Sequence, residues 1–396
     1  MTFVFLSITD WDAPQFGSRQ QIALELAQRG HRVLFVDVPR AFHSLISDPS
    51  GSRRAFSRLG KIRRIQNNLA VYTPRLVLPI YYHPVTNWVN QRLLYRDVLR
   101  GLNLVGWQPD VVWTFWANTA VFLQKFKQQH NSLTVYHCID DFTAVSYPFV
   151  SSPTIARMES EQCRTADLLF ARTRVLAERL QQWHEAATWL PGGVDVRRFD
   201  PAALTADPEI NRLPHPIAGF VGTLDQRIDV DLLQQCAQLL PHISFVFIGP
   251  VKQHQINLNA LTTLPNVHLY PACTAEEAPA KIAAFDVGLI PYQINTYTKG
   301  LSPIKLYEYL AMEKPIVAAA LPYLEREAAH IRLANTAVSF IEQVQTAVST
   351  PPTPAQKQQW RQAALDNTWA KQVDIIEEKI GSQIGPISKI GPISPD

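Results

Sequence analysis

Two loops in the second half of the chain place a glycine and a cationic side chain directly after an apolar run. Gly222 ends PIAGFVG and precedes Thr223 and Arg227, while Gly249 ends ISFVFIG and precedes Lys252. Glycine lets the backbone approach a ligand closely, and guanidinium and ammonium groups neutralise phosphates. Each cation alone is more often a solvated surface charge. Their shared position after consecutive apolar runs nevertheless favours a binding site for a phosphorylated ligand.

The stretch GLSPIKLYEYLAMEKPIV carries Lys305 and Glu308 three residues apart on the polar face of a short expected helix. One interpretation is a plain helix salt bridge, which contributes about 0.2–0.5 kcal/mol. In the other, the loop TKGLSP, with Ser302 in it, and the helix N-terminus meet a phosphate. Glu308 would then accept hydrogen bonds from vicinal sugar hydroxyls. The residues alone leave both interpretations open.

Two D-x-D triplets also occur, DWD at 10–12 and DVD at 229–231. Carboxylates at this spacing can hold a divalent ion. Aspartate also favours loops and helix starts, where it caps the backbone and complements the helix dipole. We prefer this second interpretation and expect no metal site and no cofactor. The chain has no G-x-G-x-x-G after its first strand, no G-x-x-x-x-G-K-[ST] and no G-x-S-x-G, which argues against a classical dehydrogenase, a P-loop NTPase or an α/β-hydrolase.

The elements that must position these residues follow one pattern from the start of the chain. An apolar strand in 2–8 precedes a helix in 19–30, which ends at Gly30, and a second strand follows in 31–39. Further strands are expected in 69–74, 110–116, 133–140 and 166–173, with helical patterns between several of them. This alternation predicts a doubly wound parallel sheet.

The alternation restarts after the Pro-rich stretch 200–216, which reads as part of a linker. We expect strands in 216–224, 243–250, 266–271, 285–292 and 314–320, with a helix in 230–240. Two Rossmann-like domains then face each other across a cleft, because ligands bind beyond the carboxyl ends of parallel strands. We place a first, acceptor-side domain at 1–195 and a second, ligand-binding domain at 196–368. A closing helix at 369–381 returns to the first domain, and a flexible tail fills 382–396.

Composition sets broad limits on the protein. The 396 residues carry a net charge of +3, which argues neither for nor against nucleic acid, and we expect no such partner. The four cysteines are far apart in sequence, which predicts free thiols in a reducing compartment. The apolar start lacks a basic region and no run of 18 apolar residues exists, so we expect a cytoplasmic protein without a spanning segment.

The segment 49–96 contains no Asp or Glu but nine basic residues. Six of them fall in SRRAFSRLGKIRRI, where apolar residues recur every three positions, close to a helical period. A solvated loop or hairpin explains this charge run. A basic amphipathic surface that contacts anionic lipid at the inner membrane face explains it equally well. The basic residues are Arg53, Arg54, Arg58, Lys61, Arg63, Arg64, Arg75, Arg92 and Arg96.

Several of these segments together resemble the nucleotide-sugar glycosyltransferases of the GT-B fold, specifically the retaining family-4 type. GHRVLFVD is similar to the second strand of that family, and LPGGVDVRRFDP to its N-G-V-D-x-x-x-F turn, with Gly192 in place of the Asn. GFVGTL resembles the start of its donor domain. FDVGLIPY with SPIKLYEYLAMEKPIV resembles the segment around its E-x7-E motif, and NTWAKQVDIIEEKI its closing helix.

The resemblance implies roles for individual residues. Glu308 matches the second glutamate of E-x7-E, which holds the donor's ribose hydroxyls. The first glutamate falls at Gly300, which implies that sugar recognition differs here or that transfer is lost. Lys305 and Lys299 would face the diphosphate. His137 matches a histidine at a first-domain strand end that contacts the donor sugar.

The function implied is transfer of a sugar from a nucleoside diphosphate to an acceptor with retention, without a metal, as in polysaccharide biosynthesis. The acceptor would be a glycan or a lipid-linked sugar. Arg227, Lys252 and Lys305 would stabilise the leaving diphosphate, with His137, Arg227 and Lys305 as the catalytic set. Asp12, Phe16, Gly17 and Arg19 in the first loop would shape the acceptor side. A sugar-nucleotide epimerase of the same fold and a non-catalytic protein that binds donor or a partner transferase are the alternatives.

Overall fold

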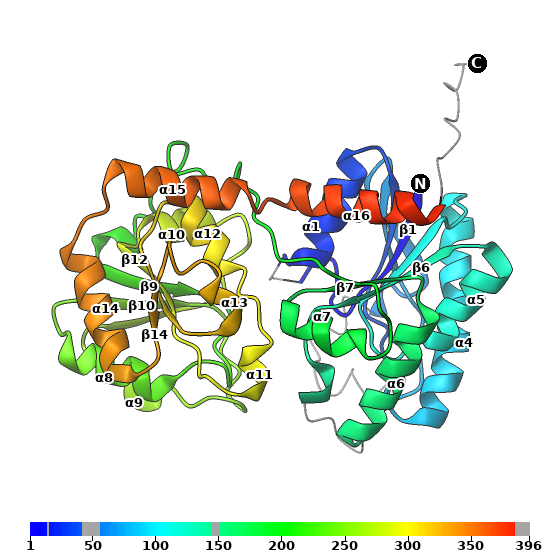
Figure 1. Ribbon diagram of the computed structural model, residues 1–396, viewed down its shortest axis with the longest axis horizontal. Helices are drawn as coiled ribbons and strands as arrows, with labels where there is room; N and C mark the ends of the chain where they lie inside the picture. Colours follow the sequence, from blue (N-terminus) through cyan, green and yellow to red (C-terminus); the bar gives the residue numbers. More distant parts are fainter. Residues whose placement is uncertain (14–15, 42–55, 145–149, 385–396) are drawn as a thin grey trace.

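The computed structural model describes residues 1–13, 16–41, 56–144 and 150–384. Two α/β domains lie side by side, and the last helix crosses from the second domain to the first (Figure 1). Each domain is built on its own parallel sheet, and each sheet has its own hydrophobic core. The predicted fold of two doubly wound domains is therefore confirmed.

The first domain has an eight-stranded sheet in the order β3-β4-β2-β1-β5-β6-β7-β8, parallel except for the pair β3 and β4. Its strands are β1 (Thr2–Leu6), β2 (Arg32–Val36), β3 (Lys61–Gln66), β4 (Leu69–Thr73), β5 (Val111–Thr114), β6 (Leu133–Cys138), β7 (Leu168–Ala171) and β8 (Ala187–Trp189). Its helices are α1 (Ser18–Gln28), α4 (Pro84–Val105), α5 (Ala120–His130), η1 (Phe142–Ala144), α6 (Ser152–Thr165) and α7 (Arg174–Gln181).

The second domain has a six-stranded parallel sheet in the order β11-β10-β9-β12-β13-β14. Its strands are β9 (Ile217–Val221), β10 (Ser244–Ile248), β11 (Val267–Tyr270), β12 (Val287–Ile290), β13 (Ile316–Ala319) and β14 (Arg332–Ala334). Its helices are η2 (Ile210–Arg212), α8 (Val230–Leu239), α9 (Asn259–Thr262), α10 (Ala278–Ala283), α11 (Thr296–Lys299), α12 (Lys305–Ala311), α13 (Pro322–Glu325), α14 (Ala337–Ser349) and α15 (Pro354–Leu365).

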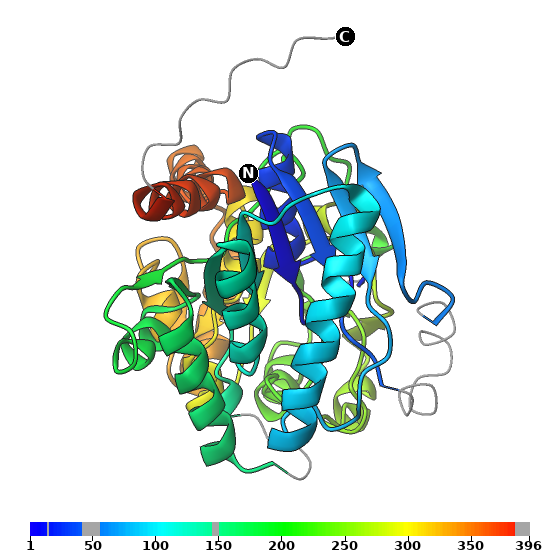
Figure 2. The ribbon, with the colours of Figure 1, turned by 90° about the vertical axis from the view of Figure 1, so that its right-hand side faces the viewer.

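The continuous apolar runs form the strands because helices cover both faces of a parallel sheet. Every residue of β1, β5, β7 and β10 is buried. Figure 2 shows α4 along the outer side of the first domain. The carboxyl ends of the strands carry the loops that line the space between the domains.

The last helix, α16 (Trp369–Ile384), packs on the first domain, as predicted, and runs three residues beyond the expected end at 381. Trp369, Val373, Ile376 and Ile380 are buried in the first core. Arg29, the C-cap residue of α1, donates to Asp374 and Glu377, both at 2.7 Å. The helix therefore fixes the chain's return to the first domain. The remaining residues of the expected tail, 385–396, lie outside the described residues.

The Pro-rich stretch 200–216 packs on the second domain. Ile210 is completely buried in the second core, and Lys281 donates to Asp207 at 3.0 Å. Arg361 of α15 donates to the carbonyls of Val196 and Ala311, at 3.0 and 2.7 Å. The chain between the domains is thus held by both side-chain and apolar contacts.

The helical spacing in SRRAFSRLGKIRRI does not produce a helix in residues 61–66, which form β3, antiparallel to β4. Asn67 and Asn68 make the turn of this hairpin, and asparagine is a residue type that tolerates the backbone conformations of tight turns. Ile62 and Ile65 pack partly against the core. Arg53 and Arg54 lie outside the described residues. In the part of the chain that is described, no helix is long and apolar enough to cross a bilayer.

Candidate active site

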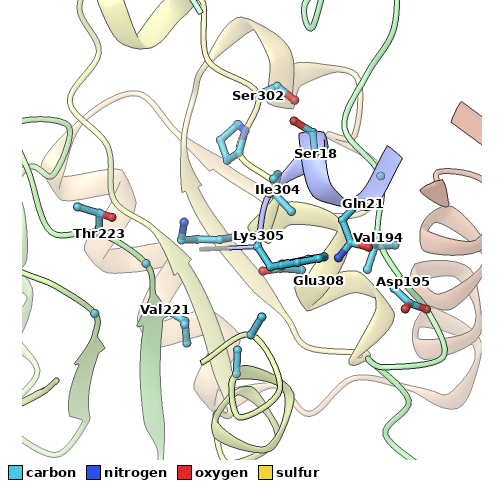
Figure 3. A pocket seen from close by; sticks show the side chains of 18 of the residues that line it. Ser18, Gln21, Val194, Asp195, Val221, Thr223, Ser302, Ile304, Lys305 and Glu308 are labelled. Atoms are coloured by element: carbon cyan, nitrogen blue, oxygen red, sulfur yellow. The ribbon is translucent and has the colours of Figure 1, made fainter. Parts of the chain in front are cut away.

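A pocket of about 320 Å³ lies between the two domains, at the carboxyl ends of both sheets. The first domain contributes the start of α1 and the ends of β6 and β7. The second contributes the ends of β9 and β10 and the start of α12. In Figure 3, Ser18 of the first domain and Ser302 of the second lie at the same end of the pocket, with Lys305 and Glu308 further in. Both expected binding surfaces therefore meet in one cavity.

The two strand-end glycines open the second-domain wall. Gly222 and Gly249 both have φ +151°, a region that side chains rarely adopt. A Cβ on Gly249 would lie 2.0 Å from the Gly222 carbonyl oxygen, and a Cβ on Gly222 would lie 2.5 Å from Lys305 Nζ. Only glycine therefore allows β9, β10 and Lys305 to approach one another this closely.

Lys305 is the first residue of α12, and its amino group points toward the loop that carries Thr223 (Figure 3). Its Nζ lies 4.8 Å from the Phe220 ring centroid and 3.5 Å from the Tyr292 hydroxyl. It forms no ion pair with a carboxylate of the described residues. An ammonium group held by rings and a hydroxyl keeps its charge available to an anion in the pocket.

Arg227 lines the same wall and is fixed by Asp225, to which its Nε and Nη2 donate at 2.7 and 2.6 Å. Burial opposes the charge, but Tyr292 and Asp225 raise the pKa of Arg227. The guanidinium also lies 5.7 Å above the Tyr292 ring. This wall therefore presents one paired and one unpaired cation.

Glu308 follows Lys305 by one turn and also lines the pocket. The helix salt bridge with Lys305 is not formed, and no described residue donates a hydrogen bond to the carboxylate. Burial raises the pKa of Glu308, against the opposite effect of Lys305 and Arg198. A half-buried carboxylate that faces a cavity without a donor is suited to accept hydrogen bonds from ligand hydroxyls.

The first-domain wall begins at the N-terminus of α1, where Phe16, Gly17 and Arg19 line the pocket as expected. Gly17 is the N-cap residue of the helix. Asp12, expected beside them, does not line the pocket. It accepts hydrogen bonds from Arg58 and Arg63, at 2.6 and 2.9 Å, because these two guanidiniums of the β3 region reach over it.

His137 is buried at the end of β6 and does not line the pocket. Neither ring nitrogen has a hydrogen-bond partner among the described residues, and the ring packs against Trp113, Phe115 and Phe170. Burial, and then the nearby Arg172, lower the pKa of His137 to about 3. The imidazole is therefore neutral, and it contacts aromatic rings where contact with a sugar was expected.

Lys252 and Lys299 are exposed and lie outside the pocket lining, although the sequence placed both on the donor. Lys252 lies in the loop after β10, and Lys299 is the last residue of α11. Gly300 is buried at the end of α11, where no carboxylate stands. Of the donor-binding set, Gly222, Thr223, Arg227, Gly249, Ser302, Lys305 and Glu308 line the pocket.

Neither D-x-D triplet lines the pocket. Asp10 is paired with Arg40, and Asp229 caps α8 by accepting from the Leu232 amide at 3.0 Å. Among the described residues, no group of three or more His, Cys, Asp or Glu side chains is arranged to hold a metal ion. The capping interpretation of DVD is therefore confirmed for Asp229.

The pocket also contains residues that sequence reasoning did not assign, chiefly Arg172, Asp195, Arg198 and Tyr292. Arg172 follows β7 directly, and its place after a strand end was the one signal in the sequence that pointed to it. Asp195 and Arg198 lie in the GGVDVRRF turn, which crosses from one domain to the other. Asp140, in the loop that follows β6, also lines the pocket.

Comparison with known proteins agrees with this geometry. The family described as "Glycosyl transferases group 1" matches residues 215–349, the greater part of the second domain. A putative teichuronic acid biosynthesis glycosyltransferase, TuaH of Bacillus subtilis (strain 168), is 27% identical over 170 residues. That alignment covers 42% of this chain and 42% of the relative's own length.

Two solved structures share the whole architecture. Sucrose-phosphate synthase from Thermosynechococcus elongatus superposes with a TM-score of 0.71 at 14% identity, covering 96% of this chain and 99% of the other. Anabaena HepE in complex with UDP gives a TM-score of 0.64 at 16% identity, with the same coverage. At these identities the structures establish the fold. The chain therefore has the GT-B fold, and residues 215–349 of its second domain match the family described as glycosyl transferases group 1.

Proposed function

We propose that the protein is a glycosyltransferase that moves a sugar, with retention of configuration, from a nucleoside diphosphate to an acceptor. The observation that carries this proposal is the convergence of Lys305, Arg227 and Glu308 on one interdomain pocket. Two cations and one carboxylate at the carboxyl end of a sheet match the diphosphate and the ribose of such a donor. The UDP bound by Anabaena HepE makes UDP the first nucleotide to test.

In the proposed reaction the bond between the anomeric carbon and the diphosphate oxygen breaks, and charge grows on the leaving group. Lys305 and Arg227 stabilise that charge, together with the amides beside Gly222 and at the start of α1. The acceptor oxygen attacks from the same face of the sugar, and its proton passes to the leaving phosphate oxygen. No step in this scheme requires a metal ion. Glu308 holds the ribose and takes no part in bond breaking.

Two alternatives share the fold, a sugar-nucleotide epimerase and a donor-binding protein without turnover. Gly300 favours the second, because no carboxylate stands where the resemblance places a contact to the transferred sugar. Incubation of the protein with a panel of UDP-sugars separates the three. Slow release of UDP, with a free sugar whose first-formed anomer matches the donor, supports a retaining transferase. Interconverted UDP-sugars identify an epimerase, and binding without any product identifies a non-catalytic protein.

We also propose that the first domain contacts an anionic membrane surface, which would bring a lipid-linked acceptor to the pocket. The surface that supports this comprises the loop 74–83 and the outer side of α4 (Figure 2). Trp88 and Val85 are 51% and 66% exposed there, and the Arg92 guanidinium stacks 3.2 Å above the Trp88 ring. Other exposed apolar residues of this surface are Leu76, Leu78, Ile80 and Leu93, and the basic ones are Arg75, Arg92, Arg96 and Arg100.

Apolar side chains flanked by arginines suit the interface of an acidic bilayer, where each basic residue contributes about 1 kcal/mol. We expect co-sedimentation with phosphatidylserine vesicles, weakened by salt, and none with phosphatidylcholine vesicles. The double substitution Val85→Ser and Trp88→Ser should reduce it at least five-fold, whereas Val338→Ser, at an equally exposed valine of the second domain, should not. Equal binding to both vesicle types, or to neither, contradicts a membrane contact at this surface.

A further inference from the structure

Two arginines of the first domain reach the pocket from a different side than Lys305 and Arg227. Arg19 lies on the first turn of α1, and Arg172 follows β7. Both line the pocket. Arg19 Nε donates to Thr9 Oγ1 at 3.0 Å, and Arg172 Nη1 donates to Ser18 Oγ at 3.2 Å. These hydroxyls orient the guanidiniums but leave most of their hydrogen-bond donors unused.

Neither guanidinium forms an ion pair within the described residues. Elsewhere in this domain, partly buried arginines are paired, as Arg179 is with Glu159 and Arg40 with Asp10. Arg172 Nε is buried and has no hydrogen-bond partner. Asp140 is the carboxylate that acts on both guanidiniums through space, without a direct contact. Two positive charges therefore face one carboxylate in this part of the pocket.

This arrangement is costly for the free protein. Burial, and then the nearby Arg172, lower the pKa of Arg19 to about 10, and burial lowers the pKa of Arg172 as well. Burial also raises the pKa of Asp140, against the opposite effect of Arg172 and Arg19. A half-buried pair of like charges without an ion-pair partner among the described residues is a feature that a bound anion would relieve.

Arg172 lies close to the boundary between the two domains. A Cβ placed on Gly192 would lie 3.3 Å from Arg172 Nη2 and 3.8 Å from Ser302 Oγ. The guanidinium and the hydroxyl of Ser302, which is in the loop that leads into α12, thus lie near the same backbone position. A group bound here would be part of the same ligand set as the diphosphate, but on the first-domain side.

We propose that Arg19 and Arg172 form a second anion subsite, which binds a carboxylate or phosphate carried by the transferred sugar or by the acceptor. The subsite rests on the proposed transferase function, since it adds an acidic group to the substrate class of that reaction. Guanidinium forks match both anions in geometry. Lys305 and Arg227 remain the groups that hold the diphosphate. Neutral sugars gain nothing from the subsite.

Titration calorimetry on the full chain tests this with two pairs of probes. The affinities of UDP-glucuronic acid and UDP-glucose are compared to test for an acidic group on the transferred sugar. The affinities of glucose 6-phosphate and glucose, both measured at saturating UDP, are compared to test for an acidic group on the acceptor. We expect the acidic member to bind at least ten-fold more tightly in one pair, and that pair identifies the source of the anion. Equal affinities within both pairs overturn the subsite.

Variants distinguish the subsite from a structural role. Arg19→Gln and Arg172→Lys should each reduce the preference for the acidic probe at least five-fold while changing UDP affinity less than two-fold. Arg157→Gln, at an exposed arginine of α6, is the control and should change neither. Asp140→Asn should strengthen binding of the acidic probe. If Asp140→Asn instead weakens binding of the acidic probe, as the arginine variants do, then the arginines serve only to position Asp140 and the proposal is wrong.

Other outcomes also decide. Loss of UDP affinity in the Arg19 and Arg172 variants would assign these residues to the diphosphate and remove the second subsite. Failure of the unaltered protein to bind any UDP compound would contradict the proposed function. The subsite could still be tested then, by comparing the affinities of glucose 6-phosphate and glucose in the absence of UDP. A thermal unfolding scan of each variant shows whether Arg172→Lys remains folded. If it does not, Arg19→Gln decides alone.

Discussion

Replacement of Lys305 by methionine should weaken UDP binding strongly while leaving the folded protein nearly as stable. The ammonium group has no carboxylate partner among the described residues, so its removal breaks no ion pair. It loses the contact with the Phe220 ring, 4.8 Å away, which is worth about 0.5–1 kcal/mol. Methionine keeps the apolar stem. We therefore expect the free energy of unfolding to change by less than about 1 kcal/mol.

The expected loss in affinity follows from the charge. Two unit charges about 4 Å apart attract by about 4 kcal/mol at the effective dielectric of a protein surface. Desolvation of the ammonium and of the phosphate offsets about half of this, which leaves about 2 kcal/mol, or about 30-fold in Kd. Gly222→Ala should act on the same contact, because its Cβ would lie 2.5 Å from Lys305 Nζ. Backbone strain at φ +151° adds about 1–3 kcal/mol of destabilisation in that variant.

Titration calorimetry with UDP measures the loss of affinity in Lys305→Met and in Gly222→Ala. Lys357→Met, at an exposed lysine of α15, is the matched control and should leave Kd unchanged. Lys299→Met should also leave Kd unchanged, because Lys299 lies outside the pocket lining. An unaltered Kd for Lys305→Met, or an equal loss in Lys357→Met, would refute the placement of the diphosphate beside Gly222.

Three further predictions concern the carboxylate, the metal and the last helix. Glu308→Ala should weaken UDP binding at least ten-fold with a change in unfolding free energy within about 1 kcal/mol. Burial raises the pKa of Glu308 above its usual value of 4.5, so UDP affinity should fall as pH is lowered and the carboxylate becomes protonated. Glu308→Gln should remove this component, and an identical pH profile in both proteins contradicts the assignment. Activity should survive EDTA, and complete loss that magnesium or manganese restores would show that a metal takes part. Arg29→Ala should destabilise the protein by about 1–3 kcal/mol in denaturant unfolding, because Asp374 and Glu377 both lose their shared partner, whereas an unchanged midpoint would show that α16 is held by its apolar face alone.

The strands were predictable because a strand that is buried on both faces of a sheet appears in the sequence as a continuous apolar run. TFVFL and SFVFI are apolar throughout, and both form buried strands of parallel sheets. β3 was not predictable in the same way, since KIRRIQ is polar and its apolar residues fit a helical spacing equally well. Its strand conformation depends on pairing with β4, a contact that no local pattern encodes.

The candidate site was predictable where backbone geometry demanded a residue type. Gly222 and Gly249 stand at strand ends that only glycine permits, and Lys305 and Glu308, one helical turn apart on α12, both line the pocket. Side chains whose direction depends on tertiary neighbours were harder. Asp12 is drawn away by Arg58 and Arg63, and His137 lies beneath aromatic rings. Arg172 enters the pocket from a strand end that carried no distinctive motif.

The most direct test of the central claim is a crystal structure of the protein with UDP bound. We expect the diphosphate between Lys305, Arg227 and the backbone at Gly222, and both ribose hydroxyls on the carboxylate of Glu308. UDP bound at another place, or in the pocket with its ribose away from Glu308, would contradict the account.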